Sequence, residues 1–188
     1  MNVFLSASVP MPDRDQRFYK SADLVGIREA VKSLVIEVAR NGRLTFGGHP
    51  AITPLIALVL RQSFPDRAGS FILYQSEYFL RQFPKENDAF IDVHVTPAVD
   101  DNRAESLALM RREMLTHCRY DAAFFIGGME GVIEEFELLR DLQPEVPVYP
   151  IASTGAAALD LYVRGEWDTS LMDELTYPTL FRKLLQTV

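Results

Sequence analysis

Apolar runs of strand length alternate with amphipathic helical segments along most of this chain, and this alternation constrains the fold more than any other feature. Strands that are almost continuously apolar, each followed by a helix, are typical of a parallel sheet covered on both faces. Right-handed crossovers then favour an α/β fold, a doubly wound (Rossmann-like), mainly parallel sheet with helices on both faces. The expected strands are residues 3–9, 43–48, 70–76, 91–97, 121–128 and 146–153.

Three residues predict where helices begin and end. Asp23 is a good N-cap for a helix whose apolar residues recur every three or four positions, and Gly42 stops that helix. Pro54 fits the next helix because a proline is tolerated in a first turn. The segments 10–23 and 77–90 are expected to be a loop and an irregular crossover.

Composition narrows the class of protein. The 188 residues, 48% of them apolar, suit a single domain over 1–188, with C-terminal helices from about 168. A net charge of -7 without a basic stripe argues against nucleic acid, and the absence of a long apolar run argues against a membrane. Cys118 is the only cysteine of the sequence, so an internal disulfide is impossible, and this favours a cytoplasmic location. We expect the Cys118 thiol to be packed in the fold rather than to act as a nucleophile.

Two glycine pairs stand where strand gives way to helix, Gly47-Gly48 and Gly127-Gly128. The carboxyl ends of parallel strands meet at one edge, so the loops at Ser6, Gly47, Gly127 and Ser153 are expected to be neighbours. Glycine permits a positive φ and close approach, and a helix N-terminus attracts an anion. Each pair could simply make a tight turn, but two in corresponding positions favour a ligand site.

The usual nucleotide motifs are missing. The sequence has no GxxxxGK[ST] segment, and no GxGxxG follows the first strand, so ordinary triphosphate or NAD binding is not indicated. Ser6 and Ser8 offer hydroxyl groups at the end of that strand instead.

Four segments together resemble a known superfamily: "FLSASVP", "TFGGHPAITPLI", a helix bearing "MRREML", and "FFIGGMEGVIEEF". This pattern, from about Val3 to Thr154, resembles the SLOG superfamily of Rossmann-like domains. That superfamily is related to SMF/DprA and to the LOG nucleoside-monophosphate phosphoribohydrolases. In LOG enzymes the second loop reads PGGxGTxxE, and an arginine from the preceding helix acts with the glutamate to cleave an N-glycosidic bond.

The resemblance implies roles for individual residues. Glu135 falls at the position of the glutamate, and Arg112, or alternatively Arg111, at that of the arginine. Glu135 would activate water or stabilise the developing oxocarbenium charge; alternatively it belongs to a solvated helix face. The glycines of the motif correspond to Gly127, Gly128 and Gly131.

The second loop also departs from the LOG pattern. Val132 replaces the threonine whose hydroxyl would bind phosphate, Ile126 replaces the proline, and Met129-Glu130 lengthens the loop by one residue. A carboxylate at Glu130 would repel a phosphate about 4 Å away by several kcal/mol at an effective dielectric near 20. We therefore expect Glu130 to face ribose hydroxyls or to turn into solvent.

Other residues complete the candidate site. His49 is expected either to donate to a ligand or to shape its turn, and Thr154 and Gly155 repeat the strand-to-helix pattern. Arg14 and Arg17 could close over an anion or remain solvated. His94 and His117 are expected to lie far apart, so neither a metal nor a cofactor is expected. The ligand-binding candidates are Ser6, Ser8, Gly47, Gly48, His49, Gly127, Gly128, Met129, Glu130, Gly131, Thr154 and Gly155.

Three functions are compatible with these patterns. The first is binding or sensing of a nucleotide-derived small molecule of the nucleoside monophosphate, NAD or ADP-ribose type. The alternative is a LOG-like nucleotide N-glycosidase, and a structural interaction protein is the third. A homodimer is implied by the resemblance alone.

Overall fold

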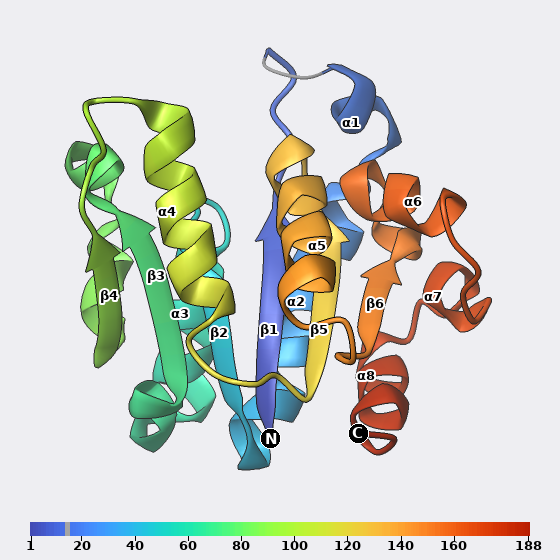
Figure 1. Ribbon diagram of the computed structural model, residues 1–188. Coiled ribbons are helices and arrows are strands. Elements are labelled where there is room, and N and C mark those ends of the chain that lie inside the picture. The colour runs from blue at the N-terminus through green and yellow to red at the C-terminus, as the bar shows by residue number, and fades with distance from the viewer. Residues whose placement is uncertain (14–15) are drawn as a thin grey trace.

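The computed structural model describes residues 1–13 and 16–188 and contains a six-stranded sheet (Figure 1). All its strand pairings are parallel, and the strand order is β4-β3-β2-β1-β5-β6. The predicted fold class is therefore confirmed. The strands are β1 (Asn2–Ser8), β2 (Arg43–Gly47), β3 (Phe71–Ser76), β4 (Asp92–Thr96), β5 (Ala122–Gly127) and β6 (Val148–Ile151).

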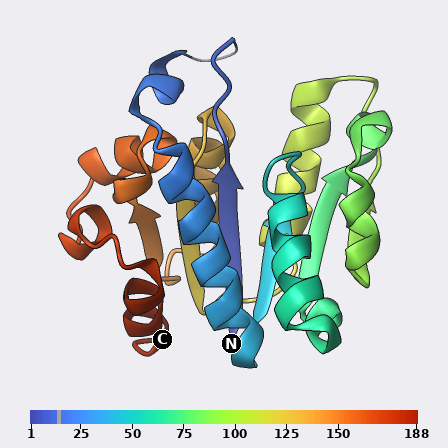
Figure 2. The ribbon, with the colours of Figure 1, turned by 180° about the vertical axis from the view of Figure 1, so that it is seen from behind.

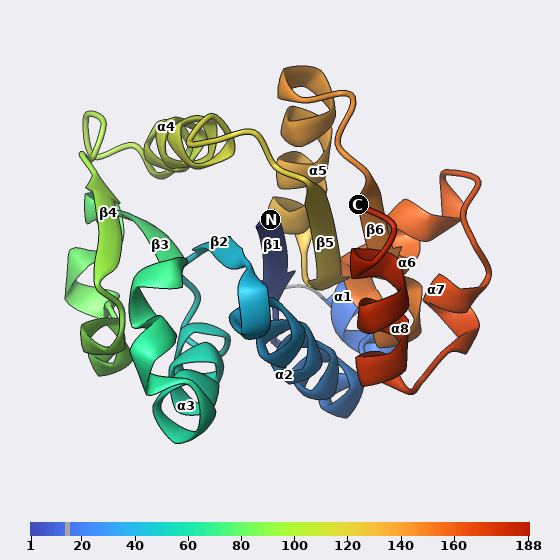
Figure 3. The same cartoon turned by 90° about the horizontal axis from the view of Figure 1, so that it is seen from below.

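Helices cover both faces of the sheet (Figures 1 and 2). One face carries α2 (Leu24–Asn41), α3 (Thr53–Ser63) and α8 (Tyr177–Leu185), and the other carries α4 (Arg103–Leu115) and α5 (Glu130–Leu142). Figure 3 shows these two layers from below, with α6 (Ala156–Val163) beside β6. The shorter helices are α1 (Gln16–Ser21), α7 (Ser170–Asp173) and the 3-10 helices η1 (Pro65–Ser70), η2 (Glu77–Gln82), η3 (Lys85–Ala89) and η4 (Ala152–Thr154).

The strand β5 shows how a continuously apolar strand supports both layers. Successive side chains of a strand point to opposite faces. Phe124 packs edge to face against Phe181 of α8, with ring centroids 5.3 Å apart, whereas Phe125 packs against Phe136 of α5 at 5.2 Å. Both β5 side chains are fully buried. Each such side chain stabilises the fold by about 1.5–3 kcal/mol, so these contacts hold β5 between α8 and α5.

Most local predictions are confirmed, and one is incomplete. Asp23 caps α2, because its Oδ1 accepts hydrogen bonds from the N–H groups of Val25 and Gly26 at 3.0 and 2.8 Å. Pro54 lies in the first turn of α3. The predicted loop 10–23 instead contains α1, whose Phe18 is buried. A single buried residue in six leaves no periodic signal, so the pattern could not indicate this helix.

The order of the strands shows where the chain stops adding strands on one side of β1 and starts adding them on the other. From β1 the chain builds outward to β4 through α2, α3 and 3-10 helices, and α4 then returns it to β5, which lies on the other side of β1. In open sheets of this kind ligands bind beyond the carboxyl ends of the strands at such a point. Here that point lies between β1 and β5.

Candidate ligand site at the carboxyl ends of β1 and β5

The second glycine loop has a backbone that requires glycine. Gly127 and Gly128 have φ angles of 58° and 90°, which side chains rarely adopt. A Cβ added at Gly127 would lie 2.4 Å from Ile27 Cδ1, and one at Gly128 would lie 2.2 Å from Val132 Cγ2. The loop is closely packed, and α5 begins two residues after it.

A buried cluster of three polar side chains, Ser6, Arg111 and Glu135, lies beside this loop. The Ser6 hydroxyl of β1 donates to Glu135 Oε2 at 2.6 Å, and Arg111 Nε of α4 donates to Glu135 Oε1 at 3.3 Å. The side chains of Arg111 and Glu135 are each only 13% exposed. Three elements far apart in sequence, β1, α4 and α5, therefore converge on one carboxylate.

The surroundings of Glu135 change its acidity. Burial raises the pKa of the Glu135 carboxyl above its usual value, and the Arg111 guanidinium and the Ser6 hydroxyl act in the opposite direction. A buried carboxyl with a raised pKa is suited to accepting or donating a proton, and a guanidinium beside it is suited to an oxyanion or a ribose.

Arg111, rather than Arg112, is the arginine of this site. Arg111 also forms an ion pair with Glu134, and its Nη2 would be 2.7 Å from a Cβ placed on Gly131. Its guanidinium thus lies over the first turn of α5, whereas Arg112 is exposed. Neighbouring residues on a helix point about 100° apart, so a sequence assignment that is wrong by one position selects the wrong face. The sequence pattern pointed to Arg112 first and to Arg111 as the alternative; the structure corrects this choice, because Arg111 and not Arg112 contacts Glu135.

The remaining members of the second loop surround this polar group. Ser8 is paired in register with Gly127, and its Oγ lies 3.3 Å from the position of a Cβ at Gly128. Met129 is partly buried, and Glu130 is the exposed first residue of α5. These residues lie around the start of α5, and their role in binding a ligand stays a prediction.

The first glycine loop has another character. Neither of its glycines has a positive φ, and the nearest atom to a Cβ at Gly47 would be Met114 Sδ, 3.7 Å away. A Cβ at Gly48 would be 2.2 Å from Nε2 of the buried Gln75. Asn87 Nδ2 donates to Gln75 Oε1 at 2.7 Å and holds this carboxamide in place.

His49 has contacts within its own loop. Its N–H donates to Thr53 Oγ1 at 3.0 Å, and its Nδ1 accepts from the N–H of Ala51 at 3.2 Å. These bonds organise the start of α3. Of the two roles predicted for His49, they support the turn role.

Thr154 and Gly155 lie behind the loop, in its packing. Thr154 is fully buried; its hydroxyl donates to the carbonyl of Ile151 at 2.6 Å and accepts from the N–H of Gly127 at 2.9 Å. A Cβ on Gly155 would be only 1.8 Å from the carbonyl oxygen of Ser21. The structure therefore does not bring either residue to the accessible side of the site, because the segment before α2 covers them.

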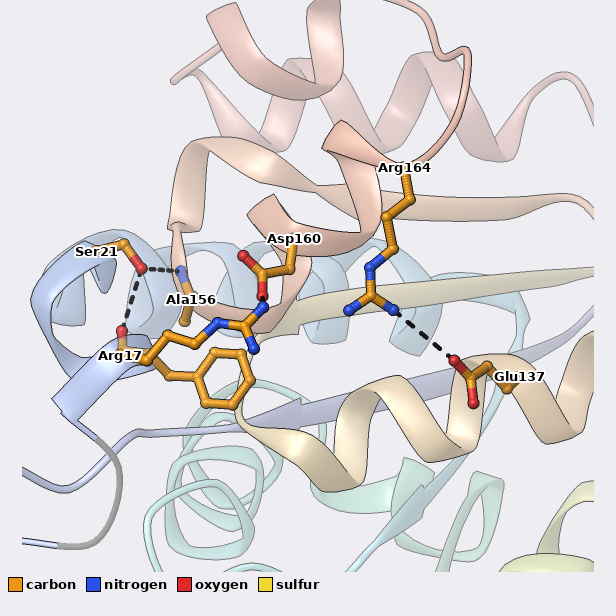
Figure 4. Close-up of polar contacts among 7 residues, drawn as sticks. Arg17, Ser21, Glu137, Ala156, Asp160 and Arg164 are labelled. Atoms are coloured by element: carbon orange, nitrogen blue, oxygen red, sulfur yellow. Dashed lines mark hydrogen bonds and ion pairs between the residues drawn. The ribbon is translucent and has the colours of Figure 1, made fainter.

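Figure 4 shows how α1, α6 and the far side of α5 are held together. Arg17 forms an ion pair with Asp160, and the Ser21 hydroxyl accepts from the N–H of Ala156 at 3.3 Å. Arg164 pairs with Glu137 at 3.7 Å. Arg14 and Arg17 were expected either to close over an anion or to remain solvated. Arg17 contacts Asp160 of α6, and Arg14 lies outside the described residues.

The prediction that His94 and His117 are far apart is wrong. Their ring centroids are 5.2 Å apart, and Tyr74, whose hydroxyl lies 2.9 Å from His117 Nδ1, stacks on His94. The end of α4 returns over β3 and β4, a tertiary contact that linear spacing does not indicate. Burial raises the pKa of Tyr74 to about 12 and lowers that of His117. Within residues 1–13 and 16–188, no group of three potential ligands is placed to hold a metal.

Two surface cavities lie away from the cluster of Ser6, Arg111 and Glu135. A cavity of about 510 Å³ lies near Cys118 and Gln143, where burial raises the pKa of the Cys118 thiol. Another of about 450 Å³ lies between α2 and α3, lined in part by Leu24 and Leu58. Neither includes Arg111 or Glu135. The cluster of Ser6, Arg111 and Glu135 is the better candidate site, because it combines buried charge with the switch point of the sheet.

The fold and the cluster of Ser6, Arg111 and Glu135 define a Rossmann-like α/β protein with a candidate small-molecule site at the carboxyl ends of β1 and β5. The sequence model of the SLOG cluster3 family matches residues 17–185, so the chain belongs to that family. The chain is also similar to the X-ray structure of TM1055, a target of the Northeast Structural Genomics Consortium. That likeness has a TM-score of 0.64 and 13% sequence identity, covering 100% of this chain and 99% of that chain.

The TM1055 likeness shows the fold alone at this identity. A search of curated proteins gave no match. In the parts of the chain that the structure describes, no helix has the length and hydropathy to cross a membrane. The predicted homodimer and cytoplasmic location stay predictions.

Proposed function

We propose that this protein binds a nucleotide-derived small molecule at the corner formed by Ser6, Arg111, Glu135 and the second glycine loop. The observation that carries the proposal is the convergence of Ser6 and Arg111 on the buried Glu135, directly beside the start of α5. A ribose or phosphate at this corner would meet a guanidinium, carboxylate oxygens and the N–H groups that open a helix.

Membership of the SLOG cluster3 family supports a nucleotide-related ligand. The switch point between β1 and β5 is also where Rossmann-like sheets bind their ligands. Because Arg111 lies over Gly131, a ligand entering here would displace the guanidinium or bind against it.

Titration calorimetry tests this proposal with a panel of AMP, NAD, ADP-ribose and cyclic ADP-ribose. We expect at least one of these compounds to bind, and Arg111→Ala to weaken that binding about tenfold or more. Arg112→Ala is the matched control, since it removes the same charge from the exposed neighbouring position. The absence of binding to every compound would exclude the proposal.

A second candidate is a nucleotide N-glycosidase that uses Arg111 and Glu135. The raised pKa of Glu135 favours it, because a carboxyl of this kind can exchange protons with water or a departing base. Arg111 would orient the ribose or phosphate of the substrate. Chromatography of base release from AMP, CMP and NAD provides the assay. Turnover that disappears in Glu135→Gln would support the enzyme, and no release from any substrate would exclude it.

A further inference from the structure

Three aromatic side chains that play no part in the candidate ligand site meet at the edge of the sheet. Tyr74 lies on β3 and His94 on β4, which is the edge strand in Figure 1, and their rings stack with centroids 4.6 Å apart. His117 follows the end of α4, and its ring centroid lies 5.7 Å from that of Tyr74 and 5.2 Å from that of His94. We call these three side chains the edge cluster. It joins the turn after α4, residues 116–119, to two strands of the sheet.

Each histidine of the edge cluster has one ring nitrogen next to a polar partner. His94 Nε2 lies 2.8 Å from Asp92 Oδ1, and this nitrogen carries a hydrogen, because an ionised carboxylate only accepts. His117 Nδ1 lies 2.9 Å from the Tyr74 hydroxyl oxygen. Burial raises the pKa of Tyr74 to about 12, so that hydroxyl keeps its proton and can donate to Nδ1 while His117 is neutral.

The carboxylate that contacts the edge cluster is shared between two partners. Asp92 lies against His94 and also forms an ion pair with Arg43 of β2, whose Nη2 is 3.5 Å away. One shared carboxylate compensates for the charge of one imidazolium but not for that of two. Besides its own three members, the titratable and charged groups that act on the edge cluster are Arg43 on β2, Asp92 on β4, Glu113 on α4 and the thiol of Cys118.

Protonation of His117 changes its contacts in the edge cluster. The charged ring has a hydrogen on each nitrogen, so Nδ1 no longer accepts from the Tyr74 hydroxyl, and a charged His94 would repel it. Burial lowers the pKa of His117, as do the charges of His94 and Arg43, whereas Asp92 acts in the opposite direction. The unfolded chain therefore binds this proton more tightly than the folded chain, and the contact loses stability as the pH falls below the ordinary histidine value of about 6.5.

We infer that the edge cluster of Tyr74, His94 and His117 is a pH-sensitive clasp, which holds the turn after α4 against β3 and β4 near neutral pH and releases it in mild acid. The clasp is built from side chains outside the proposed ligand site, so it operates whether or not a ligand binds there. In the released state the rings of Tyr74 and His94 lose the contact with His117.

Hydrogen bonds next to the clasp confine the release to the turn. The Tyr120 hydroxyl donates to the Met114 carbonyl at 2.6 Å, and Gln143 Nε2 donates to the Leu115 carbonyl at 2.7 Å. The N–H of Tyr120 donates to Gln143 Oε1 at 3.0 Å. Burial raises the pKa of Tyr120 far above its usual value, so none of these bonds loses or gains a proton in mild acid. The amide of Tyr120 is therefore the internal reference for amides of the turn.

Long-range ¹H–¹⁵N NMR of the histidine side chains tests the coupling within the clasp, and the chain has three histidines to assign. In His94→Gln the titration midpoint of His117 should rise, because a like charge is removed, and in Asp92→Asn it should fall, because a carboxylate is removed. Both substituted side chains are partly exposed, so we expect the variants to fold. A midpoint of His117 at or above about 6.5 in wild type would overturn the clasp, as would a midpoint that neither substitution moves.

Amide hydrogen exchange tests the release itself. After correction for intrinsic rates, the amides of Thr116 and His117 should be about fivefold or more less protected at about pH 5 than at about pH 7.5, while that of Tyr120 stays unchanged. His117→Gln keeps a polar side chain that does not titrate, so the difference should disappear. Equal protection at both pH values would overturn the release, as would an equal loss at Tyr120. A difference that persists in His117→Gln would assign it to another group and overturn the clasp.

Discussion

The two glycine loops look alike in sequence, and the structure gives them different tasks. At Gly127-Gly128 the chain turns through positive φ, and packed side chains occupy the places where Cβ atoms would be. At Gly47-Gly48 the backbone has no such requirement, and the space beside Gly48 is taken by the carboxamide of Gln75. Repetition of a dipeptide therefore identified an edge of the sheet, while backbone conformation and buried charge distinguish the loop suited to a ligand.

The largest difference is expected from alanine at Gly127 compared with alanine at Gly47. Gly127→Ala places a Cβ 2.4 Å from Ile27 Cδ1 at a φ of 58°, so it should lower the free energy of unfolding by about 3 kcal/mol. In Gly47→Ala the atom nearest to the new Cβ is Met114 Sδ, 3.7 Å away, so the free energy of unfolding should change by less than about 1 kcal/mol. Urea denaturation measures both. Equal losses would remove the distinction between the loops.

Removing the guanidinium beside Glu135 should have the next largest effect. Arg111→Ala leaves a largely buried carboxylate without its charged partner, and we expect a loss of about 2 kcal/mol. The exposed Arg112→Ala should cost less than about 0.5 kcal/mol. Chemical denaturation near neutral pH compares the two variants, and similar losses would mean that Arg111 is not held as described.

Gly48→Ala tests whether the Gln75 side chain is what requires a glycine in the first loop. The new Cβ would press on Gln75, which Asn87 holds in place, so we expect a loss of about 1–2 kcal/mol. Adding Gln75→Ala to that variant should remove the crowding, so the combined loss should be smaller than the sum of the two single losses. Strict additivity would show that the backbone of Gly48, not Gln75, requires the glycine.

Glu135→Gln provides a pH test of the polar group beside the second loop. Since burial raises the pKa of Glu135 in the folded protein, the folded state binds its proton more tightly than the unfolded state does. As pH rises from the ordinary carboxyl value of about 4.3 through the raised pKa, wild type should lose stability relative to Glu135→Gln. Unfolding curves at several pH values measure this difference. A difference that is constant with pH would contradict the raised pKa.

The sequence predicted the parts of this molecule that depend on local or repeated patterns. Buried parallel strands are apolar throughout, so runs such as the one ending at Gly127 identified the sheet. Motif spacing also placed Glu135 near the second loop. It pointed to Arg112 before Arg111, and the structure has Arg111 on Glu135 instead, because the rotation of α4 about its axis is set by packing. The contacts of Gln75 with Gly48 and of His94 with His117 join separate elements, so no linear pattern indicates them.

Glycine-selective ¹⁵N labelling tests the central claim most directly, because the chain has 10 glycines and its spectrum is simple. Titration with ADP-ribose should shift the amide signals of Gly128 and Gly131 most. Gly42 and Gly69 precede the amino ends of β2 and β3, at the edge of the sheet opposite the site, so their signals should stay in place. Shifts confined to glycines other than Gly128 and Gly131 would contradict the assignment of the second loop as the ligand site.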